Sequence, residues 1–230
     1  MPELSVVIPC YNERNTICEI IDRVRKVRLD MEVVVVDDGS TDGSREALAQ
    51  VSHPNVRVIL QPENRGKGAA LRRGFAEARG QFVIVQDADL ELNPDEFPAF
   101  LDPLRTGRAD VVFGSRFARG HKGVTPFWHY FINWVLTTFS NLVNGLRLTD
   151  EACCYKCFPR QTIQAIPLES DRFGFDPEIV AKVARRKLRI EEVPITYHRR
   201  SFQEGKKIGW KDGFAALWHM VYFGWFARRY

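Results

Sequence analysis

The sequence predicts an α/β fold with a Rossmann-like, mostly parallel sheet that helices cover on both faces. The first observation is that apolar runs rich in β-branched residues recur along the first half of the chain, at residues 4–9, 32–38, 56–61, 81–87 and 109–115. The second is that segments with helical spacing separate these runs. Strands that are apolar on both faces and alternate with helices are typical of a buried parallel sheet.

The segments between the apolar runs account for the covering helices. Apolar side chains recur at helical spacing within residues 15–27, 43–51, 68–78 and 94–104. With 230 residues, 45% of them hydrophobic and 27% charged, the chain is long enough for one α/β unit with a sizeable core. We therefore expect a single domain over residues 1–230.

Two later segments are unusually apolar and aromatic. Residues 127–146 carry no formal charge and place apolar side chains on one helical face. Residues 214–227 are almost wholly apolar and are flanked by Lys211 and Arg228, but they are too short to cross a bilayer core of about 30 Å. Such helices are typical of a membrane interface, and packing on the sheet is the alternative. We expect a peripheral membrane protein with a C-terminal interfacial helix over 210–230.

The N-terminus, the cysteines and the charge distribution indicate the compartment. The chain reaches Glu3 at once and has no long apolar leader, so it does not resemble a signal peptide. Its 5 cysteines are odd in number, which favours reduced thiols over a disulfide framework. Residues 199–230 hold most of the excess of basic side chains behind the net charge of +4, which favours phosphate groups or an anionic surface as partners. We expect a cytoplasmic location at a membrane face, and no nucleic-acid partner.

Carboxylates follow the fourth predicted strand. The run VIVQDADLEL places Asp87, Asp89 and Glu91 at alternate positions where that strand ends. Ligands of open α/β sheets bind beyond the carboxyl ends of the strands. Like charges that converge there repel unless a cation joins them, and Mg²⁺ or Mn²⁺ held by one or two carboxylates commonly shares its other positions with substrate phosphates. The pattern predicts a divalent metal at Asp87 and Asp89.

The ends of the first two strands offer groups for a nucleotide. Asp38 could accept hydrogen bonds from a ribose or base, Tyr11 offers a stacking face and Glu13 a further acceptor. A dinucleotide fold would carry a glycine-rich turn after its first strand, and this chain does not. The Gly66-Lys67-Gly68 triplet lacks the rest of a phosphate-binding loop motif. NAD-dependent and P-loop ATPase functions are therefore disfavoured.

Several motifs in register resemble one family. VVIPCYNE, VVVVDDGSTDGS, NRGKGAALRRG, QDADLE and GSRF, in this order, are similar to family 2 glycosyltransferases of the GT-A fold, and specifically to the polyprenyl (dolichyl) phosphate sugar synthases typified by dolichol-phosphate mannose synthase. The similarity continues through residues 148–158, 172–200 and 204–207, so it covers essentially the whole chain. It implies that residues 1–115 bind a nucleotide sugar and that residues 116–209 bind the acceptor.

The resemblance also implies roles for individual residues. The nucleotide sugar would be held by Pro9, Tyr11, Glu13, Val36, Asp38, Asp87, Ala88, Asp89 and Arg116. The metal on the diphosphate would be bound by Asp87, Asp89 and, in the third ligand place, Glu91, although the family often has Gln or Ser there. The catalytic set would be Asp89, Arg200, Lys206 and Asp150. Of these, Arg200 and Lys206 would contact phosphate groups, and Asp150 would position the acceptor or act as a base, with capping of its loop as the alternative.

These implications define the expected function. We expect a metal-dependent inverting transferase that moves a hexose from a nucleotide diphosphate sugar, GDP-mannose first and UDP-glucose second, to a polyprenyl or dolichyl phosphate at the cytosolic membrane face. Many relatives carry a transmembrane domain after the catalytic part, which leaves room here for a separate membrane-anchoring subunit. The alternatives are a family 2 transferase that acts on a soluble glycan hydroxyl and a non-catalytic, nucleotide-sugar-binding scaffold subunit.

Overall fold

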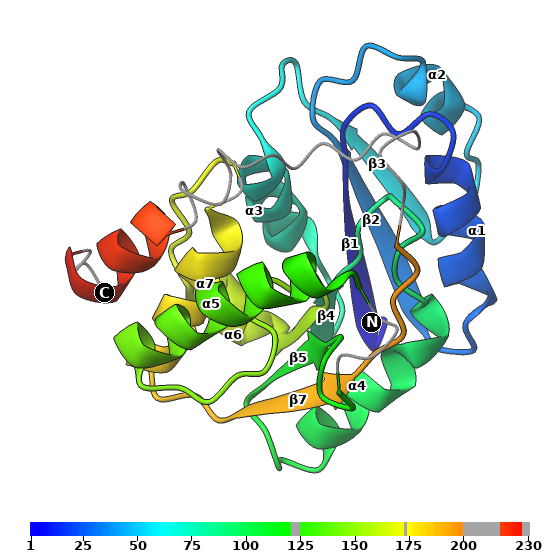
Figure 1. Cartoon of the computed structure of the whole chain (residues 1–230). Helices are drawn as coiled ribbons and strands as arrows, with labels where there is room; N and C mark the ends of the chain where they lie inside the picture. Colours follow the sequence, from blue (N-terminus) through cyan, green and yellow to red (C-terminus); the bar gives the residue numbers. More distant parts are fainter. Residues whose placement is uncertain (121–124, 173, 200–216, 227–230) are drawn as a thin grey trace.

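The computed structural model describes residues 1–120, 125–172, 174–199 and 217–226, and it contains one seven-stranded sheet with helices on both faces (Figure 1). The strand order is β3-β2-β1-β4-β6-β5-β7. The strands are β1 (Leu4–Cys10), β2 (Met31–Asp37), β3 (Val56–Leu60), β4 (Phe82–Val85), β5 (Val111–Ser115), β6 (Lys156–Pro159) and β7 (Ile190–Pro194). All neighbouring pairs are parallel except the two that β6 makes with β4 and β5. The predicted fold class is confirmed.

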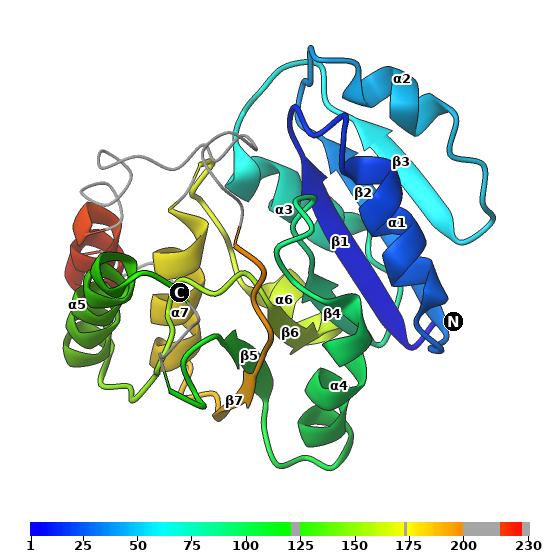
Figure 2. The same cartoon turned by 45° about the vertical axis from the view of Figure 1, so that its right-hand side comes forward.

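Helices form two layers around this sheet. One face is covered by α1 (Ile17–Lys26), α2 (Ser44–Ala49) and α4 (Phe97–Arg105), and the other by α3 (Lys67–Glu77), α6 (Arg160–Ala165) and α7 (Phe175–Arg185) (Figures 1 and 2). The turn η1 (Pro94–Glu96) leads into α4. Helix α1 shows the expected pattern, because its buried side chains are Ile17, Ile20, Ile21 and Val24.

The central strands form where both faces are apolar. Val33, Val34, Val35 and Val36 of β2 are fully buried, as are the four valine and isoleucine positions of β1 and β4 that pair with one another. Strand β4 ends at Val85, so Asp87 and Asp89 follow the strand, as the sequence predicts. The chain already turns after Val85, which is what allows the carboxylates beyond it to leave the alternation of an extended strand.

Helix α5 (Phe127–Asn144) packs its polar side against the protein. Its buried residues are Asn133, Thr137 and Ser140. The opposite side is exposed and apolar, and its exposed members include Phe127, Trp128, Phe131, Ile132, Trp134, Val135 and Leu142. The alternative in which this helix packs its apolar face on the sheet is therefore wrong, and the aromatic side chains face outward.

The C-terminal segment lies beside α5 and α7. Residues 217–221 are α-helical and continue into the π-helical turn η3 (Tyr222–Phe226), which contacts both helices (Figure 2). Met220 and Phe223 are buried, whereas Trp218, Trp225 and Phe226 are more than half exposed. The described part of the predicted C-terminal interfacial helix therefore has a buried side and an exposed aromatic side.

Candidate active site

The predicted site residues gather at one edge of the sheet. The carboxyl ends of the parallel strands β1, β2 and β4 lie there. Strand β6 runs antiparallel to β4, with Cys157 opposite Ile84, so the segment before β6 reaches the same edge. The carboxyl end of β5 lies there as well, because β5 also pairs antiparallel with β6. The edge thus brings together Asp38, Asp87, Arg116 and Asp150, which are far apart in the sequence.

Asp87 forms an ion pair with Lys67, the first residue of α3. The Lys67 Nζ lies 2.7 Å from Asp87 Oδ1, and the two side chains are 20% and 25% exposed. Burial alone would favour the neutral acid, but the Lys67 ammonium outweighs it and lowers the pKa of Asp87. In return, and against the effect of its own burial, the Asp87 carboxylate raises the pKa of Lys67. Both groups are therefore charged at neutral pH.

Asp89 and Glu91 are arranged by a sharp turn at Leu90. Leu90 has a φ of 50°, which is rare for a residue with a side chain, and the Asp89 Oδ1 accepts a hydrogen bond of 3.2 Å from the Glu91 N–H. The Glu91 carboxylate accepts from the Tyr197 hydroxyl at 2.9 Å. The Glu91 carbonyl accepts from the His198 N–H at 2.8 Å. Glu91 is thus tied to the segment that follows β7.

Asp38 is buried and organises the loop that precedes α3. Its Oδ1 accepts from the Arg65 N–H at 3.0 Å and from the Gln61 side chain at 2.8 Å, and its Oδ2 accepts from the Gly66 N–H at 2.7 Å. Burial raises the pKa of Asp38 despite these donors. The structure gives this carboxylate three protein donors, in addition to any contact with a ribose or base.

The remaining residues predicted to bind the nucleotide lie around the same strand ends. Tyr11 is 38% exposed, and Glu13 accepts a hydrogen bond of 2.8 Å from Thr16 at the start of α1. Pro9 is partly buried, whereas Val36 and Ala88 are buried and can shape the site only through packing or their backbone. Tyr11 is therefore the member of this group best placed to offer a face for stacking.

Arg116 and Asp150 form a second charged pair at this edge. Arg116 follows β5, and its Nε and Nη2 lie 2.6 and 2.7 Å from Asp150 Oδ2 and Oδ1. The Arg116 guanidinium also lies over the rings of Phe117 and Tyr197, at 5.4 and 5.3 Å from their centroids. Because Arg116 engages both carboxylate oxygens of the fully buried Asp150 side chain, Asp150 is better suited to positioning than to proton abstraction.

The donor set at Asp87 and Asp89 fits a hard divalent cation that is completed by a substrate. Among the described residues, no group of three His, Cys, Asp or Glu side chains is arranged to hold a metal ion. Two neighbouring carboxylates at a strand end are nevertheless enough for Mg²⁺ or Mn²⁺ when phosphate oxygens supply further ligands. The residues present therefore fit a metal that binds together with a diphosphate.

Two of the predicted phosphate-binding residues, Arg200 and Lys206, lie outside the described residues. The roles given to them by the resemblance stay predictions. The division of the chain at residue 115 into donor and acceptor halves also stays a prediction.

A further cluster of titratable groups surrounds the buried Lys156 side chain. The Lys156 ammonium donates to Asp176 Oδ1 at 2.5 Å and to the Glu151 carbonyl at 3.1 Å. Burial raises the pKa of Glu151 to about 8, and its Oε1 has no hydrogen-bond partner among the described residues. At neutral pH the Glu151 side chain is therefore largely a neutral acid.

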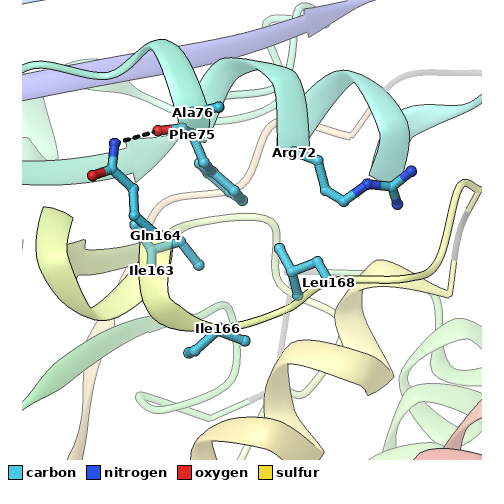
Figure 3. Close-up of a pocket in the computed structure, with 7 residues that line it drawn as sticks. All are labelled: Arg72, Phe75, Ala76, Ile163, Gln164, Ile166 and Leu168. Carbon is cyan, nitrogen blue, oxygen red and sulfur yellow. Dashed lines mark hydrogen bonds between the residues drawn. The ribbon is translucent and has the colours of Figure 1, made fainter. Parts of the chain in front are cut away.

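A separate hollow of about 350 Å³ lies between α3 and the segment around α6 (Figure 3). Its lining is mainly apolar and includes Phe75, Ile163 and Leu168, and the Gln164 side chain donates to the Phe75 carbonyl at 2.8 Å. None of the predicted site residues lines it. The hollow is therefore not the candidate active site.

Two residues of the site were not predicted from the sequence. The sequence marks Lys67 only as part of a weak glycine-flanked phosphate motif, and it gives no local signal for the pairing with Asp87. Tyr197 gave no signal, because nothing in its sequence context indicates that it contacts both Arg116 and Glu91.

Comparisons with known proteins identify the family of the chain. Residues 5–166 match the family described as glycosyl transferase family 2. An undecaprenyl-phosphate mannosyltransferase of Micrococcus luteus is 35% identical over 212 residues, which cover 88% of this chain and 86% of the relative. A low-salt glycan biosynthesis hexosyltransferase of Haloferax volcanii is 32% identical over 91% of this chain, but this chain spans only 52% of that protein.

A solved structure has the same fold. The glucosyl-3-phosphoglycerate synthase of Mycobacterium tuberculosis, in complex with Mn²⁺, uridine diphosphate and phosphoglyceric acid, aligns with a TM-score of 0.72 at 21% identity, covering 97% of this chain and 78% of that chain. Such a likeness supports the fold alone. Among the described helices, none combines the length and apolar character needed to cross a membrane.

Proposed function

The chain belongs to glycosyl transferase family 2, and from this premise we propose that it transfers a hexose from a nucleotide diphosphate sugar to a polyprenyl or dolichyl phosphate at the cytosolic face of a membrane. The orientation of α5 is the observation that favours a lipid acceptor over a soluble one. The polar side of this helix is buried and its aromatic side is exposed. A transferase with a soluble acceptor has no need of such a surface.

The exposed side of α5 has the chemistry of an interfacial helix. Phe127, Trp128, Phe131 and Trp134 form a chain of neighbouring rings, with centroids 5.8 to 6.3 Å apart. Tryptophan-rich apolar faces bind at the boundary between head groups and acyl chains. Contiguous exposed apolar surface of this kind marks interaction sites in soluble proteins. The proposed membrane contact is this face together with the exposed side of the C-terminal helical segment.

In the proposed reaction, the acceptor phosphate attacks the anomeric carbon of the sugar. A new C–O bond forms as the bond to the diphosphate breaks, and the nucleoside diphosphate leaves with the bonding electrons. A lipid phosphate is already an anion near neutral pH, so it needs cations that orient it more than a base. Arg116, held by Asp150, is such a cation, and Arg200 and Lys206 are proposed as further ones.

Asp87 and Asp89 are the proposed holders of Mg²⁺ or Mn²⁺, and the bound metal supplies neutralisation of the diphosphate. Tyr11, Glu13 and Asp38 are proposed to receive the nucleoside. The name of the Micrococcus relative, a mannosyltransferase, supports GDP-mannose as the first donor to test, with UDP-glucose as the second.

The test incubates purified protein with Mn²⁺, polyprenyl phosphate and radiolabelled GDP-mannose or UDP-glucose. Label is expected in the organic phase with one of the two donors. Asp89→Ala is expected to lose turnover with an unchanged melting curve. No organic-phase label with either donor, in the presence of lipid vesicles, would contradict the proposed lipid acceptor. Label on an added soluble glycan instead would favour the alternative acceptor class.

A further inference from the structure

We propose that Lys67 is a resident cation of the metal site, which neutralises Asp87 before the donor arrives and competes with the divalent metal for that carboxylate. The inference rests on the proposed role of Asp87 as a metal ligand. It gives Lys67 control over when the metal binds, which is a property additional to the sugar transfer itself.

The contact between the two side chains occupies Oδ1, one of the two Asp87 oxygens that could bind a metal. Lys67 Nζ lies 2.7 Å from Asp87 Oδ1 and also contacts the Cys154 thiol, at 3.6 Å. An ammonium ion and a divalent cation on one carboxylate oxygen would repel each other strongly. Metal binding at Asp87 is therefore opposed by Lys67 unless the ammonium moves away.

The structure holds Lys67 in this place through the loop before α3. Asp38 accepts hydrogen bonds from the two backbone N–H groups of Arg65 and Gly66, immediately before Lys67. Gly66 has a φ of 105°, and a Cβ atom there would overlap the Asp171 carbonyl. A Cβ atom on Gly68, directly after Lys67, would overlap the Ser170 carbonyl. The backbone on both sides of Lys67 is thus fixed, and only its side chain is free to move.

The balance of charges explains how a nucleotide would relieve the competition between Lys67 and the metal for Asp87. A metal that arrives alone must displace the ammonium and leave it without an anion in a partly buried site, which is unfavourable. A metal that arrives with a diphosphate brings anionic oxygens to which the displaced ammonium can pair. Lys67 would thereby make the metal bind weakly by itself and more tightly with the nucleotide.

The test measures the affinity of the protein for Mn²⁺ alone, at pH 7.5, from the loss of the free-ion signal in electron paramagnetic resonance. Wild type is compared with Lys67→Met, which removes the charge, and with Lys67→Arg, which retains it. We expect Lys67→Met to bind Mn²⁺ about tenfold more tightly than wild type, between the effects of exposed and buried ion pairs. Lys67→Arg is expected to stay within about threefold of wild type.

Lys26→Met is the matched control, because Lys26 is an exposed lysine at the end of α1. It should leave Mn²⁺ affinity unchanged. Lys67→Gln, which retains a hydrogen-bond donor, replaces Lys67→Met if that variant does not give a wild-type melting curve. Equal or weaker Mn²⁺ binding by the folded neutral variant, with measurable binding by wild type, overturns the inference and leaves the proposed function standing. If neither protein binds Mn²⁺, the proposed metal role of Asp87 falls as well, whereas organic-phase label would still support the transfer.

Discussion

Arg116 and Asp150 form a two-point ion pair at the carboxyl end of β5, with N–O distances of 2.6 and 2.7 Å. The Asp150 side chain is 0% exposed and that of Arg116 is 17% exposed. The Arg116 backbone N–H also donates to Asp150 Oδ2, at 3.0 Å. The pair therefore fixes both the backbone and the side chain of Arg116 at the end of β5.

Replacement of either partner should destabilise the fold, and replacement of both should restore part of the loss. Arg116→Met leaves a buried carboxylate without its cation, which costs about 3–5 kcal/mol. Asp150→Leu leaves the guanidinium unpaired. The double variant removes both charges, so its free energy of unfolding should exceed that of Arg116→Met by about 1 kcal/mol or more. Urea unfolding of all four proteins gives the four free energies.

Transfer activity separates the structural role of this pair from its role in binding phosphate. Because Arg116 is a proposed phosphate ligand, the double variant should stay at least about 10²-fold less active than wild type, even where its stability recovers. A double variant that regains both stability and turnover would show that Arg116 serves only the fold.

The carboxylates of Asp89 and Glu91 should respond differently to the same chemical change. Glu91→Gln retains an oxygen that accepts from the Tyr197 hydroxyl, so the fold should be retained. The turnover of this variant should stay within about threefold of wild type. Asp89→Asn removes a proposed charged metal ligand and should lower turnover by about 10²-fold or more. Initial rates over a range of Mn²⁺ concentrations test both variants. Equal losses in the two variants would instead give Glu91 a role in ligation as large as that of Asp89.

The sequence was informative where burial is uniform along a strand. The runs that form β1, β2 and β4 are apolar on both faces, so their pattern predicts strands of a buried parallel sheet. Strands β6 and β7 were not predicted, because they are short and contain Lys156 in the one and two glutamates in the other. The Lys156 side chain is buried in spite of its charge because Asp176 and backbone carbonyls surround the ammonium. Those partners come from elsewhere in the chain and leave no local signal.

The candidate site was predictable to the extent that it consists of strand ends. Asp38, Asp87 and Asp89 could be placed at one edge because parallel strands end together there. The pairing of Lys67 with Asp87 was not predictable, because it depends on the path of the loop that Asp38 holds. The outward orientation of the α5 aromatics is not predictable either, since an amphipathic pattern alone does not say which face is buried.

Stability should fall with rising pH through the ionisation of Glu151. Burial raises its pKa to about 8 in the folded protein, whereas an unfolded glutamate titrates near about 4.3. Between these values the folded state binds more protons than the unfolded state, so the stabilisation is complete at low pH and is lost as the pH approaches 8. Glu151→Gln cannot ionise. The free energy of unfolding of this variant, relative to wild type, should therefore rise by about 1 kcal/mol or more from pH 5.5 to pH 8.5.

Glu46→Gln serves as the control for this pH series, because Glu46 is exposed on α2. Its difference from wild type should be flat over the same range. A flat difference for Glu151→Gln as well would show that the folded protein accommodates the Glu151 carboxylate without cost, through Lys156 or solvent.

The exposed aromatic side of α5 should determine binding to lipid. Trp128 and Trp134 are 70% and 51% exposed, so their replacement by serine removes apolar surface without opening the core. If each ring transfers part of its area into the bilayer interface, the double variant should bind anionic vesicles at least about tenfold more weakly than wild type. Leu60→Ser is the matched control, because Leu60 is 55% exposed at the end of β3, on a different element. Vesicle sedimentation measures the partitioning.

Transfer of the sugar to a short, water-soluble polyprenyl phosphate should survive in Trp128→Ser/Trp134→Ser, because the charged edge of the sheet is untouched. Unchanged vesicle binding by that double variant would remove α5 from the membrane contact and with it the observation that favours a lipid acceptor.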